Sequence, residues 1–368
     1  MDTKFDYIDS DEKLIAFSRE IASANWLAVD TEFMRERTYY AQLALIQIAS
    51  DKSFALIDVP ALSSLAPLRE IFTRESCLKI MHSASQDMEV LGQALGVMPI
   101  PLFDTQIAAS FLGEADQISY AAIVKQRIGT ELDKDQTRTN WLQRPLSPAQ
   151  LGYAQADVLY LYELYEQLNT ELESAGRVEW AQQESQSLAE KMRVGAEPEL
   201  AWQRLKSLSR LSPVQQHIAR ALASWREQRA QQRDLPREWI LNKQALTGIA
   251  KMQPDSLRQL EEVEGLNPKV IQRIGKQLLK VIERVSVNHC ESLVSAELDA
   301  DQRRQAKRLM ACLREIGEIR NIAPSLMANR SVIERLVSGE RDLAILKGWR
   351  AQVAGEKLLG SLNEWNAE

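Results

Sequence analysis

Short apolar runs alternate with amphipathic segments over the first half of the chain. The run Trp26–Val29 has the length and composition of a buried strand, and residues 43–48 and 53–59 predict two further strands joined by a turn. Three successive strands connected so closely indicate an antiparallel meander. The apolar residues 78–82 and 102–104 predict two more strands. Helical segments separate the later strands, as in an α/β domain.

Capping residues mark the starts of two helices. Ser83 and Gln86 fit a capping box that opens a helix running to about residue 95. Ser147 and Gln150 fit a second capping box, with Pro148 at the first helical position, and open one long helix to about residue 175. Further helices are expected over residues 62–72, 105–112 and 119–128, and the pattern beyond residue 176 is helical throughout.

The helical half carries a weak internal repeat. Residues 236–243 resemble residues 323–330 at an offset of 87, and each segment has a proline near its start and an asparagine near its end. Gly265 and the two residues after it are echoed from Gly348 onward after a small deletion. Two copies of a four- or five-helix module, the second more divergent, are the simplest explanation.

Charge separates the two halves of the chain. The 368 residues carry a net charge of −6 and have the composition of an ordinary globular protein. Residues 1–200 hold 17 basic against 31 acidic residues, a net −14, whereas residues 201–368 hold 28 against 20, a net +8. This split predicts a carboxylate-rich site in one half and a polyanion-holding surface in the other. We therefore expect a fragment ending near Leu200 to fold with its site complete and to grip polyanions less.

The sequence shows no sign of export or of membrane insertion. No apolar stretch reaches the roughly 18–20 residues of a membrane helix, and the first residues lack the pattern of a signal peptide. Cys77, Cys290 and Cys312 are widely spaced and form no disulfide or metal pattern. These features predict a reduced, cytoplasmic protein without a membrane partner.

Acidic residues occur at the ends of predicted elements. Asp30 and Glu32 are two apart where the first strand ends, so they share one face. Such a pair repels and loses solvation, and a divalent cation would relieve both costs. Asp87 is expected where a helix follows a strand, and Tyr153 and Asp157 are four apart on one helical face. Each feature alone also fits an ordinary surface, but together they predict a metal site.

These residues, in this order, resemble the tyrosine-bearing branch of the DEDD exonuclease superfamily. The three motifs are Val29–Phe33, His82–Asp87 and Tyr153–Asp157. In the helical half, three stretches look like the HRDC domain: Trp225–Glu227, Arg233–Pro236 and Gly265–Leu266. An exonuclease domain followed by two HRDC domains is similar to the bacterial ribonuclease D family, as are the stretches Tyr39–Leu43 and Trp141–Ser147. The resemblance covers nearly the whole chain.

The resemblance implies a fold and an activity. Residues 1–200 would form a ribonuclease H-like α/β exonuclease domain, a mixed sheet flanked by helices. Residues 207–290 and 291–368 would form two all-α HRDC bundles, the second more divergent. The activity would be hydrolytic 3′→5′ exoribonuclease action that releases 5′-mononucleotides. The RNA partner would be tRNA precursors with 3′ extensions and other stable RNAs, and a monomer is favoured.

The resemblance also implies a role for each site residue. Two divalent ions, Mg²⁺ or Mn²⁺, would be held by carboxylate oxygens, which such hard cations prefer. Asp30 would bridge both ions, Glu32 and Asp157 would help to hold the first, and Asp87 would serve the second. Tyr153 would orient the attacking water.

Four further residues are candidate substrate contacts. His82 could touch the scissile phosphate, although a buried strand-end histidine is equally consistent with the pattern. Trp141 could stack on a base or anchor a loop in the core. Gln42 and Arg144 could contact the RNA backbone.

Two other functions are compatible with the same residues. A 3′→5′ DNA exonuclease could use the same fold, because the residues that would contact an RNA 2′-hydroxyl are not apparent. A non-catalytic RNA-binding scaffold is the alternative from another class. The complete set of four clustered acids argues against a scaffold, which has no need of them.

Overall fold

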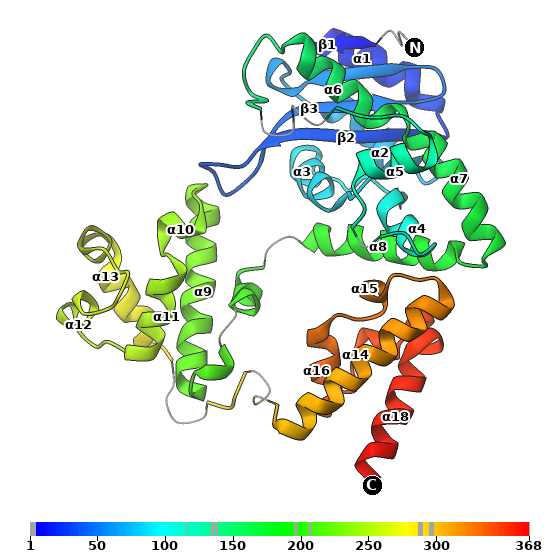
Figure 1. Cartoon of the computed structure of the whole chain (residues 1–368). Coiled ribbons are helices and arrows are strands. Elements are labelled where there is room, and N and C mark those ends of the chain that lie inside the picture. The colour runs from blue at the N-terminus through cyan, green and yellow to red at the C-terminus, as the bar shows by residue number, and fades with distance from the viewer. Residues whose placement is uncertain are drawn as a thin grey trace. The chain divides into compact units, whose positions relative to one another are not determined.

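The computed structural model describes residues 5–115, 117–133, 136, 139–194, 197–205, 208–285, 290–293 and 298–367 (Figure 1). The chain divides into two compact units. One comprises Met1–Met34, Gln42–Arg193 and Ala300–Glu368, and the other comprises Arg35–Ala41 and Val194–Asp299. Within the described ranges, no helix combines the length and the apolar character needed to cross a bilayer.

A mixed sheet lies at the centre of the first unit. Its strand order in the described residues is β1 (Asp6–Ile8), β4 (Phe54–Asp58), β3 (Gln42–Ala49), β2 (Trp26–Met34), β5 (Leu78–Met81) and β6 (Leu102–Asp104). Strands β2, β3 and β4 pair antiparallel, as predicted, and the other neighbours pair parallel. Strand β2 is longer than predicted because its pairing with β3 continues to Met34. Asp30 and Glu32 therefore lie within the strand rather than at its end.

Helices cover both faces of the sheet (Figure 1). One face packs against α1 (Asp11–Glu20), α2 (Arg69–Thr73), α3 (Ser85–Leu95) and α8 (Val178–Val194). The other packs against α6 (Pro148–Leu159) and α7 (Leu161–Ser174). Because side chains alternate along a strand, Val29 faces the first group and Ala28 faces the second. Asp30 and Glu32 have the parity of Ala28 and point to the α6 side.

The predicted capping box at Ser83 is not formed. Helix α3 begins at Ser85, and Ser83 takes a positive φ of 56°. The carboxylate of Asp104 accepts the backbone N–H groups of Ser83 (3.1 Å) and Ala84 (2.8 Å) instead. The same carboxylate caps α4 (Thr105–Ser110) through Gln106 N–H. The carboxylate of a residue 21 positions away thus caps the backbone where a local capping box was predicted.

The second capping box is confirmed, but the long helix after it is not continuous. Ser147 and Gln150 bond reciprocally, with Pro148 in the first turn. The helix breaks at Tyr160 into α6 and α7. The hydroxyl of Tyr120, on α5 (Tyr120–Arg127), donates to Ala156 O and accepts from Tyr160 N–H, each at 3.2 Å. A side chain inserted into the backbone ladder in this way interrupts a helix.

The helix predicted over residues 62–72 is also shorter than expected. A 3₁₀ turn at Ala66–Leu68 precedes α2, which begins at Arg69. Pro67 lies in that turn. Because proline has no backbone N–H to donate and clashes with the preceding helical turn, the α-helix cannot extend back through it.

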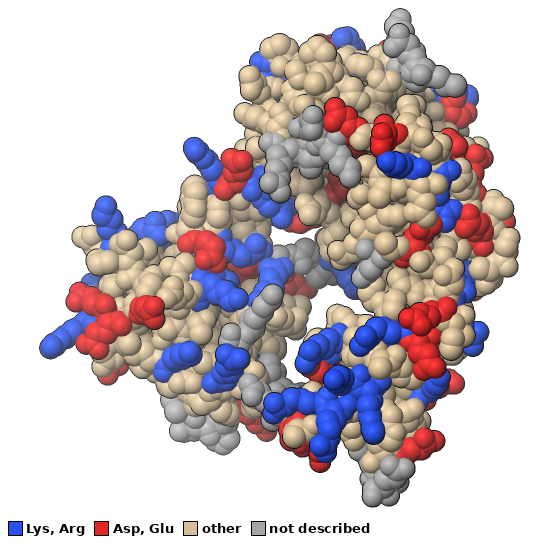
Figure 2. Space-filling model, viewed as in Figure 1, with Lys and Arg blue, Asp and Glu red and all other residues tan. Residues whose placement is uncertain are grey.

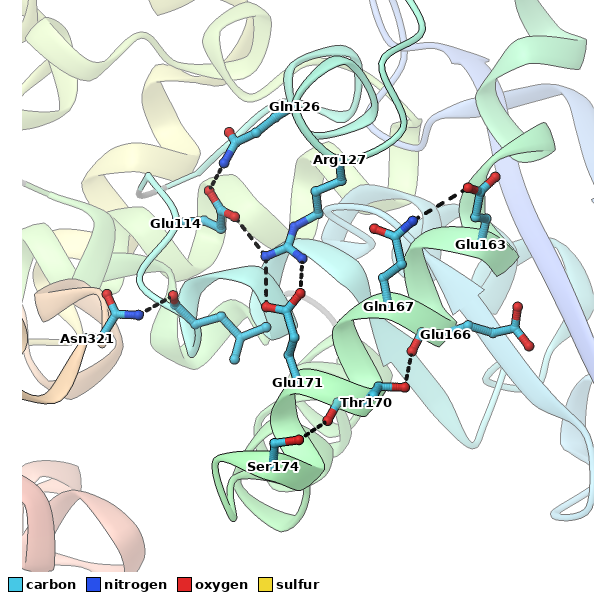
Figure 3. A network of polar contacts seen from close by, with 11 residues as sticks. Glu114, Gln126, Arg127, Glu163, Glu166, Gln167, Thr170, Glu171, Ser174 and Asn321 are labelled. Atoms are coloured by element: carbon cyan, nitrogen blue, oxygen red, sulfur yellow. Dashed lines mark hydrogen bonds and ion pairs between the residues drawn. The ribbon is translucent and has the colours of Figure 1, made fainter.

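A polar network joins α5 to α7 (Figure 3). Arg127 pairs with Glu171 of α7 (2.6 Å) and with Glu114 (2.8 Å), and Gln126 donates to Glu114 (2.7 Å). Beside it, Asn321 donates to the carbonyl of Leu112 (2.7 Å). The network fixes α5, the helix that carries Tyr120 into the break between α6 and α7.

The second unit is a helical bundle. Its helices are α9 (Pro213–Arg233), α10 (Arg237–Ile240), α11 (Lys243–Met252), α12 (Leu257–Glu261) and α13 (Pro268–Glu283), around a common apolar core. The loop between β2 and β3 belongs to this unit. Tyr39 in that loop donates its hydroxyl to the buried Glu227 (2.5 Å) and accepts from Arg237 (3.1 Å). Within this unit, the residues of the loop are therefore held by α9 and α10.

The predicted internal repeat is confirmed as a repeat of helices. The C-terminal set is α14 (Ala300–Arg320), α15 (Pro324–Met327), α16 (Arg330–Val337), α17 (Gly348–Arg350) and α18 (Glu356–Ala367). Helices α14, α15 and α16 each begin 87 positions after α9, α10 and α11. Asp234 and Asn321 take φ of 48° and 49° after the long helices. Asn242 and Asn329 cap α11 and α16 through backbone N–H groups.

The C-terminal helices pack against the α/β part of the first unit. Trp349 stacks on Trp180 of α8, with ring centroids 5.5 Å apart and planes inclined by 18°. Glu184 binds both ends of the Arg350 guanidinium, at 2.5 and 2.7 Å. Burial acts to raise the pKa of Glu184, but the bonds from Arg350 and Trp349 outweigh it and lower that pKa. A bidentate pair this buried marks a fixed interface.

This packing would be lost in a fragment ending near Leu200. Removing residues 201–368 would expose the rings of Phe111 and Trp180, which contact Trp349. It would also leave the half-buried Glu184 without Arg350, its charge partner. The first compact unit includes residues 300–368, and the charge of the sequence contains no information about this contact.

Candidate active site

Strand β2 and helix α6 bring three carboxylates together. Asp30 and Glu32 project from the face of β2 that α6 covers, and Asp157 projects from α6. One carboxylate oxygen from each lies within 4.8 Å of the other two. All three side chains are half-buried. The sequence predicted that these residues converge, and the structure places them together.

Asp87 approaches β2 from the opposite side. It lies in the first turn of α3 and is 8% exposed. Strand β5 pairs with β2 only as far as Ala28, so the edge of β2 beyond that point is open to the helix that follows β5. The hydroxyl of Thr31, between the two acids of β2, donates to the Asp87 carboxylate. Asp87 is therefore held next to the three-carboxylate cluster but outside it.

Burial raises the pKa of all four acids, and repulsion from other acids of the set adds to it for Asp30, Glu32 and Asp157. Burial, followed by the charges of the other acids, raises the pKa of Asp30 well above its ordinary value. Burial is also the largest cause for the other three, raising the pKa of Glu32 to about 9, of Asp157 to about 7 and of Asp87 to about 6. Hydrogen bonds from Tyr153 to Asp157 and from Thr31 to Asp87 act in the opposite direction. Ionising this cluster costs free energy that a bound cation would return.

The donor set fits a hard divalent cation. The cluster offers carboxylate oxygens, and no histidine or cysteine belongs to it among the residues that the structure describes. Mg²⁺ and Mn²⁺ prefer oxygen ligands, whereas zinc sites favour nitrogen and sulfur. The ligands come from a strand and a helix packed against each other, so their spacing is set before any ion binds.

We expect the metal-free protein to lose stability as pH rises from about 5 to 9. A carboxyl group with a raised pKa binds more protons in the folded than in the unfolded state above pH 4, so the free energy of unfolding falls as pH rises towards the folded pKa. Thermal melting in EDTA at constant ionic strength measures this slope. The slope should be shallower in Asp30→Asn, and a melting temperature that rises from pH 6 to 9 would contradict the expectation.

Tyr153 lies one helical turn before Asp157 on α6. Its side chain hydrogen-bonds the Asp157 carboxylate, which lowers the pKa of that acid against the effect of burial. Its ring lies 6.0 Å from that of the buried Trp141. The phenol ring thus lies near Trp141, and its hydroxyl is directed at the Asp157 carboxylate.

Three of the four predicted substrate contacts are engaged inside the protein. His82 lies between Thr105 Oγ1 (2.8 Å) and Ile118 O (2.9 Å), and burial lowers its pKa. Trp141 is 1% exposed, which matches the core alternative rather than base stacking. Arg144 pairs with Asp58 through two nitrogens, at 2.6 and 2.8 Å. Contacts of these three side chains with RNA therefore stay predictions.

Gln42 remains a predicted substrate contact. It is exposed at the start of β3, opposite Met34. Its place on the hairpin that carries Asp30 and Glu32 is compatible with that role.

Residues outside the predicted set also support the site. Thr31 orients Asp87, and its position between two acids of one motif was the available signal. Tyr120 interrupts the ladder directly after Asp157, and no local pattern indicated it. Gln47 is fully buried opposite Asp30 in β3, and it was the one polar residue in the run Leu43–Ile48.

The chain is similar to known exonucleases over most of its length. Residues 5–173 match a family model described as 3′-5′ exonuclease, and residues 215–282 match the HRDC domain. The chain is 34% identical to ribonuclease D of Shewanella sp. (strain ANA-3), over 96% of this chain and 93% of that protein. It is 32% identical to ribonuclease D of Escherichia coli (strain K12), over 98% and 99%.

Solved structures show the same likeness. The crystal structure of Escherichia coli RNase D, described as an exoribonuclease involved in structured RNA processing, has a TM-score of 0.90 at 31% identity and covers 99% of this chain and 100% of that one. A protein from Bifidobacterium adolescentis has a TM-score of 0.69 at 22% identity over 97% of both chains, a likeness of fold.

Proposed function

The chain belongs to the ribonuclease D family and is a 3′→5′ exoribonuclease, and from this premise we propose that it trims tRNA precursors with 3′ extensions, using two divalent ions, Mg²⁺ or Mn²⁺. Asp30, Glu32, Asp157 and Asp87 would hold the ions. The observation that carries this proposal is the cluster of three carboxylates within 4.8 Å, with the fourth acid beside it. A protein without a cation to bind would be more stable with neutral residues at these positions.

The protein's own part in the reaction is to hold ligands and orient water. The ions supply charge at the phosphate being attacked and at the leaving oxygen. Asp30, Glu32 and Asp157 present oxygen ligands from two packed elements, and Thr31 fixes the carboxylate of Asp87. These contacts pre-organise the ligands, so little rearrangement is required when RNA arrives.

Tyr153 would position the attacking water beside the carboxylates. Its hydroxyl already hydrogen-bonds Asp157, so one further bond to water would fix the direction of attack. A hydroxyl in this position is suited to orienting the water.

A basic surface on α14 would hold the body of the RNA. Figure 2 shows Lys and Arg side chains gathered over the region where Figure 1 places α14. We define the α14 basic surface by Arg303, Arg304, Lys307 and Arg308, all exposed on the first turns of the helix. Arg308 also lies over the ring of Trp365, with 5.2 Å from guanidinium to ring centroid. This surface belongs to the same compact unit as the carboxylates, and its charge suits phosphates.

Changing Arg304, Lys307 and Arg308 together to glutamine is expected to lower the affinity for a tRNA precursor. The dependence of that affinity on salt should also become weaker. Each lost phosphate contact lowers the slope of log K against log salt by about 0.7–0.9. Binding isotherms at several salt concentrations measure the slope. The matched control changes Lys269, Lys276 and Lys280, exposed on α13, to glutamine and removes the same charge. Equal losses in both triple variants would show that overall charge, not the α14 basic surface, holds the RNA.

The proposed substrate class can be tested directly. Purified protein is incubated with a 3′-extended tRNA, a mature tRNA and DNA of matched sequence, each with Mg²⁺, Mn²⁺ or EDTA. We expect 5′-mononucleotides from the extended tRNA with either metal and none in EDTA. Faster digestion of the DNA would favour the DNA exonuclease alternative, and binding without hydrolysis would favour the scaffold.

The domain boundaries, oligomeric state and location form part of the proposal. We infer an exonuclease domain over residues 1–200 and HRDC domains over 207–290 and 291–368, supported by the HRDC match at 215–282 and by the helix repeat at an offset of 87. We also propose a monomer in the cytoplasm. Cys77, Cys290 and Cys312 are all free thiols, which suits a reducing compartment. Sedimentation equilibrium measures the mass in solution.

A further inference from the structure

Strand β3 contains a buried polar side chain that has no hydrogen-bond partner in the described structure. Gln47 is 0% exposed, and neither its amide nitrogen nor its amide oxygen has a hydrogen-bond partner in the described structure. It is the one polar residue between Leu43 and Ala49. Buried amides are nearly always satisfied, so an unsatisfied one calls for a ligand or a functional reason. A methionine of similar length would fill the same space without an unmet polar group.

Gln47 lies directly beside the metal ligand Asp30. The register of the antiparallel pair places Gln47 opposite Asp30, and directly opposite residues share one face with their Cβ atoms about 4.5–5.5 Å apart. On its other side, Gln47 is opposite Leu56, which cannot hydrogen-bond through its side chain. Ala154 and Val158 of α6 cover this face with apolar groups. The pairing of β2 with β3 therefore places Asp30 as the polar neighbour of the Gln47 amide.

Two of the other acids already have partners that orient them. Thr31 donates to Asp87, and Tyr153 hydrogen-bonds Asp157. Metal-binding carboxylates are commonly held in this way by neighbouring donors, and loss of such a donor costs about 10–100-fold in metal affinity or activity. Asp30 has no corresponding side-chain hydrogen bond in the described structure, and the donor nearest by register is Gln47.

We propose that Gln47 is the positioning residue of Asp30: its Nε2–H group donates to the Asp30 carboxylate when that carboxylate ligates a divalent ion. The inference rests on the proposed function, because it assigns Gln47 to the same metal site. The donated bond fixes the rotamer of Asp30 and leaves its remaining lone pairs directed at the ions. The cost of burying the amide is then compensated in the metal-bound state.

Gln47→Met tests this inference through metal binding as well as through activity. Mn²⁺ affinity is measured by calorimetry without RNA, and kcat and KM are measured at fixed Mn²⁺. We expect the Mn²⁺ dissociation constant to rise by about 10–100-fold. The melting temperature of the metal-free protein should stay equal or rise, and KM for RNA should stay unchanged while kcat falls at limiting metal.

Gln216→Met is the matched control. Gln216 is also buried, at 3% exposed, but its amide is satisfied by Leu211 O (2.9 Å) and Leu293 N–H (2.7 Å), far along the chain from the carboxylates. This variant should lower the melting temperature and leave Mn²⁺ affinity unchanged. Unchanged Mn²⁺ affinity in Gln47→Met would overturn the inference, whatever its melting temperature.

A second variant covers the case in which Gln47→Met does not fold. Gln47→Asn keeps the amide but shortens its reach by one methylene, so it should also bind Mn²⁺ more weakly. Wild-type affinity in this variant would overturn the inference in the same way. Asp30→Asn in the same assay separates the two claims. If it abolishes hydrolysis while both Gln47 variants bind Mn²⁺ normally, the inference fails and the proposed metal site stands.

Discussion

Asp30→Asn is expected to lower the rate of RNA hydrolysis by a factor on the order of 10³ or more. The substitution keeps the shape of the side chain but removes one of the charges of the carboxylate cluster. Metal ions supply several kcal/mol of transition-state stabilisation, and about 1.4 kcal/mol corresponds to a tenfold change in rate. Single-turnover hydrolysis of a 3′-extended RNA at saturating Mg²⁺ measures the loss.

The metal-free form of the same variant should be more stable than the wild type near pH 8. The charges of Asp87, Asp157 and Glu32 each raise the pKa of Asp30, so removing its charge relieves repulsion. Asp157→Asn should behave alike. Asp51→Asn, at an exposed turn position, is the control and should leave both rate and stability unchanged. Wild-type activity in Asp30→Asn at saturating Mg²⁺ would exclude the proposed site.

Tyr153→Phe should reduce kcat by a factor on the order of 10²–10⁴, the range typical of a group that assists proton handling in the transition state. The ring and its packing near Trp141 are retained, so only the hydroxyl beside Asp157 is lost. Metal affinity and RNA affinity should therefore stay close to the wild type. Rapid-quench kinetics, with calorimetry for Mn²⁺, distinguish the rate from the affinities.

Tyr162→Phe is the matched control for the loss of a phenol hydroxyl. Tyr162 lies on α7 and stacks on Trp26, with ring centroids 4.0 Å apart, and does not belong to the carboxylate cluster. Its replacement should leave kcat unchanged. Loss of RNA affinity at an unchanged rate in Tyr153→Phe would make Tyr153 a binding residue and contradict its role in orienting water.

The acidic residues were predictable because short-range spacing determines where they point. Side chains two positions apart on a strand share a face in any fold, as for Asp30 and Glu32. Side chains four positions apart on a helix do so as well, as for Tyr153 and Asp157. The prediction for Asp87 needed only the junction of a strand and a helix. The strand order of the meander followed from short connections in the same way, and the pairings confirm it.

The errors arose where a distant partner replaced a local one. Asp104 caps the backbone at Ser83 from 21 positions away. Tyr120 breaks a helix 36 positions later through Ala156 O. Hydrophobic periodicity and capping motifs extend over a few residues, so they contain no information about these contacts.

The placement of the C-terminal helices was likewise beyond the local pattern. The repeat at an offset of 87 predicted a second helical module, and the helices confirm it. Its packing on α8 depends on the stacked rings of Trp349 and Trp180 and on the pair of Glu184 with Arg350. Each residue alone is ordinary in composition and spacing. Only the folded chain shows that they meet and that this module packs in the same compact unit as the sheet.

The metal site itself can be tested by diffraction from crystals of the protein with Mn²⁺ and a short RNA whose terminal phosphodiester resists hydrolysis. Anomalous scattering locates each Mn²⁺ ion independently of the protein atoms. We predict two anomalous peaks, one among Asp30, Glu32 and Asp157 and the other beside Asp87, with the RNA 3′ end between Tyr153 and the ions. Anomalous peaks elsewhere, or a 3′ end bound with no peak at these carboxylates, would contradict a metal-dependent exoribonuclease site at this position.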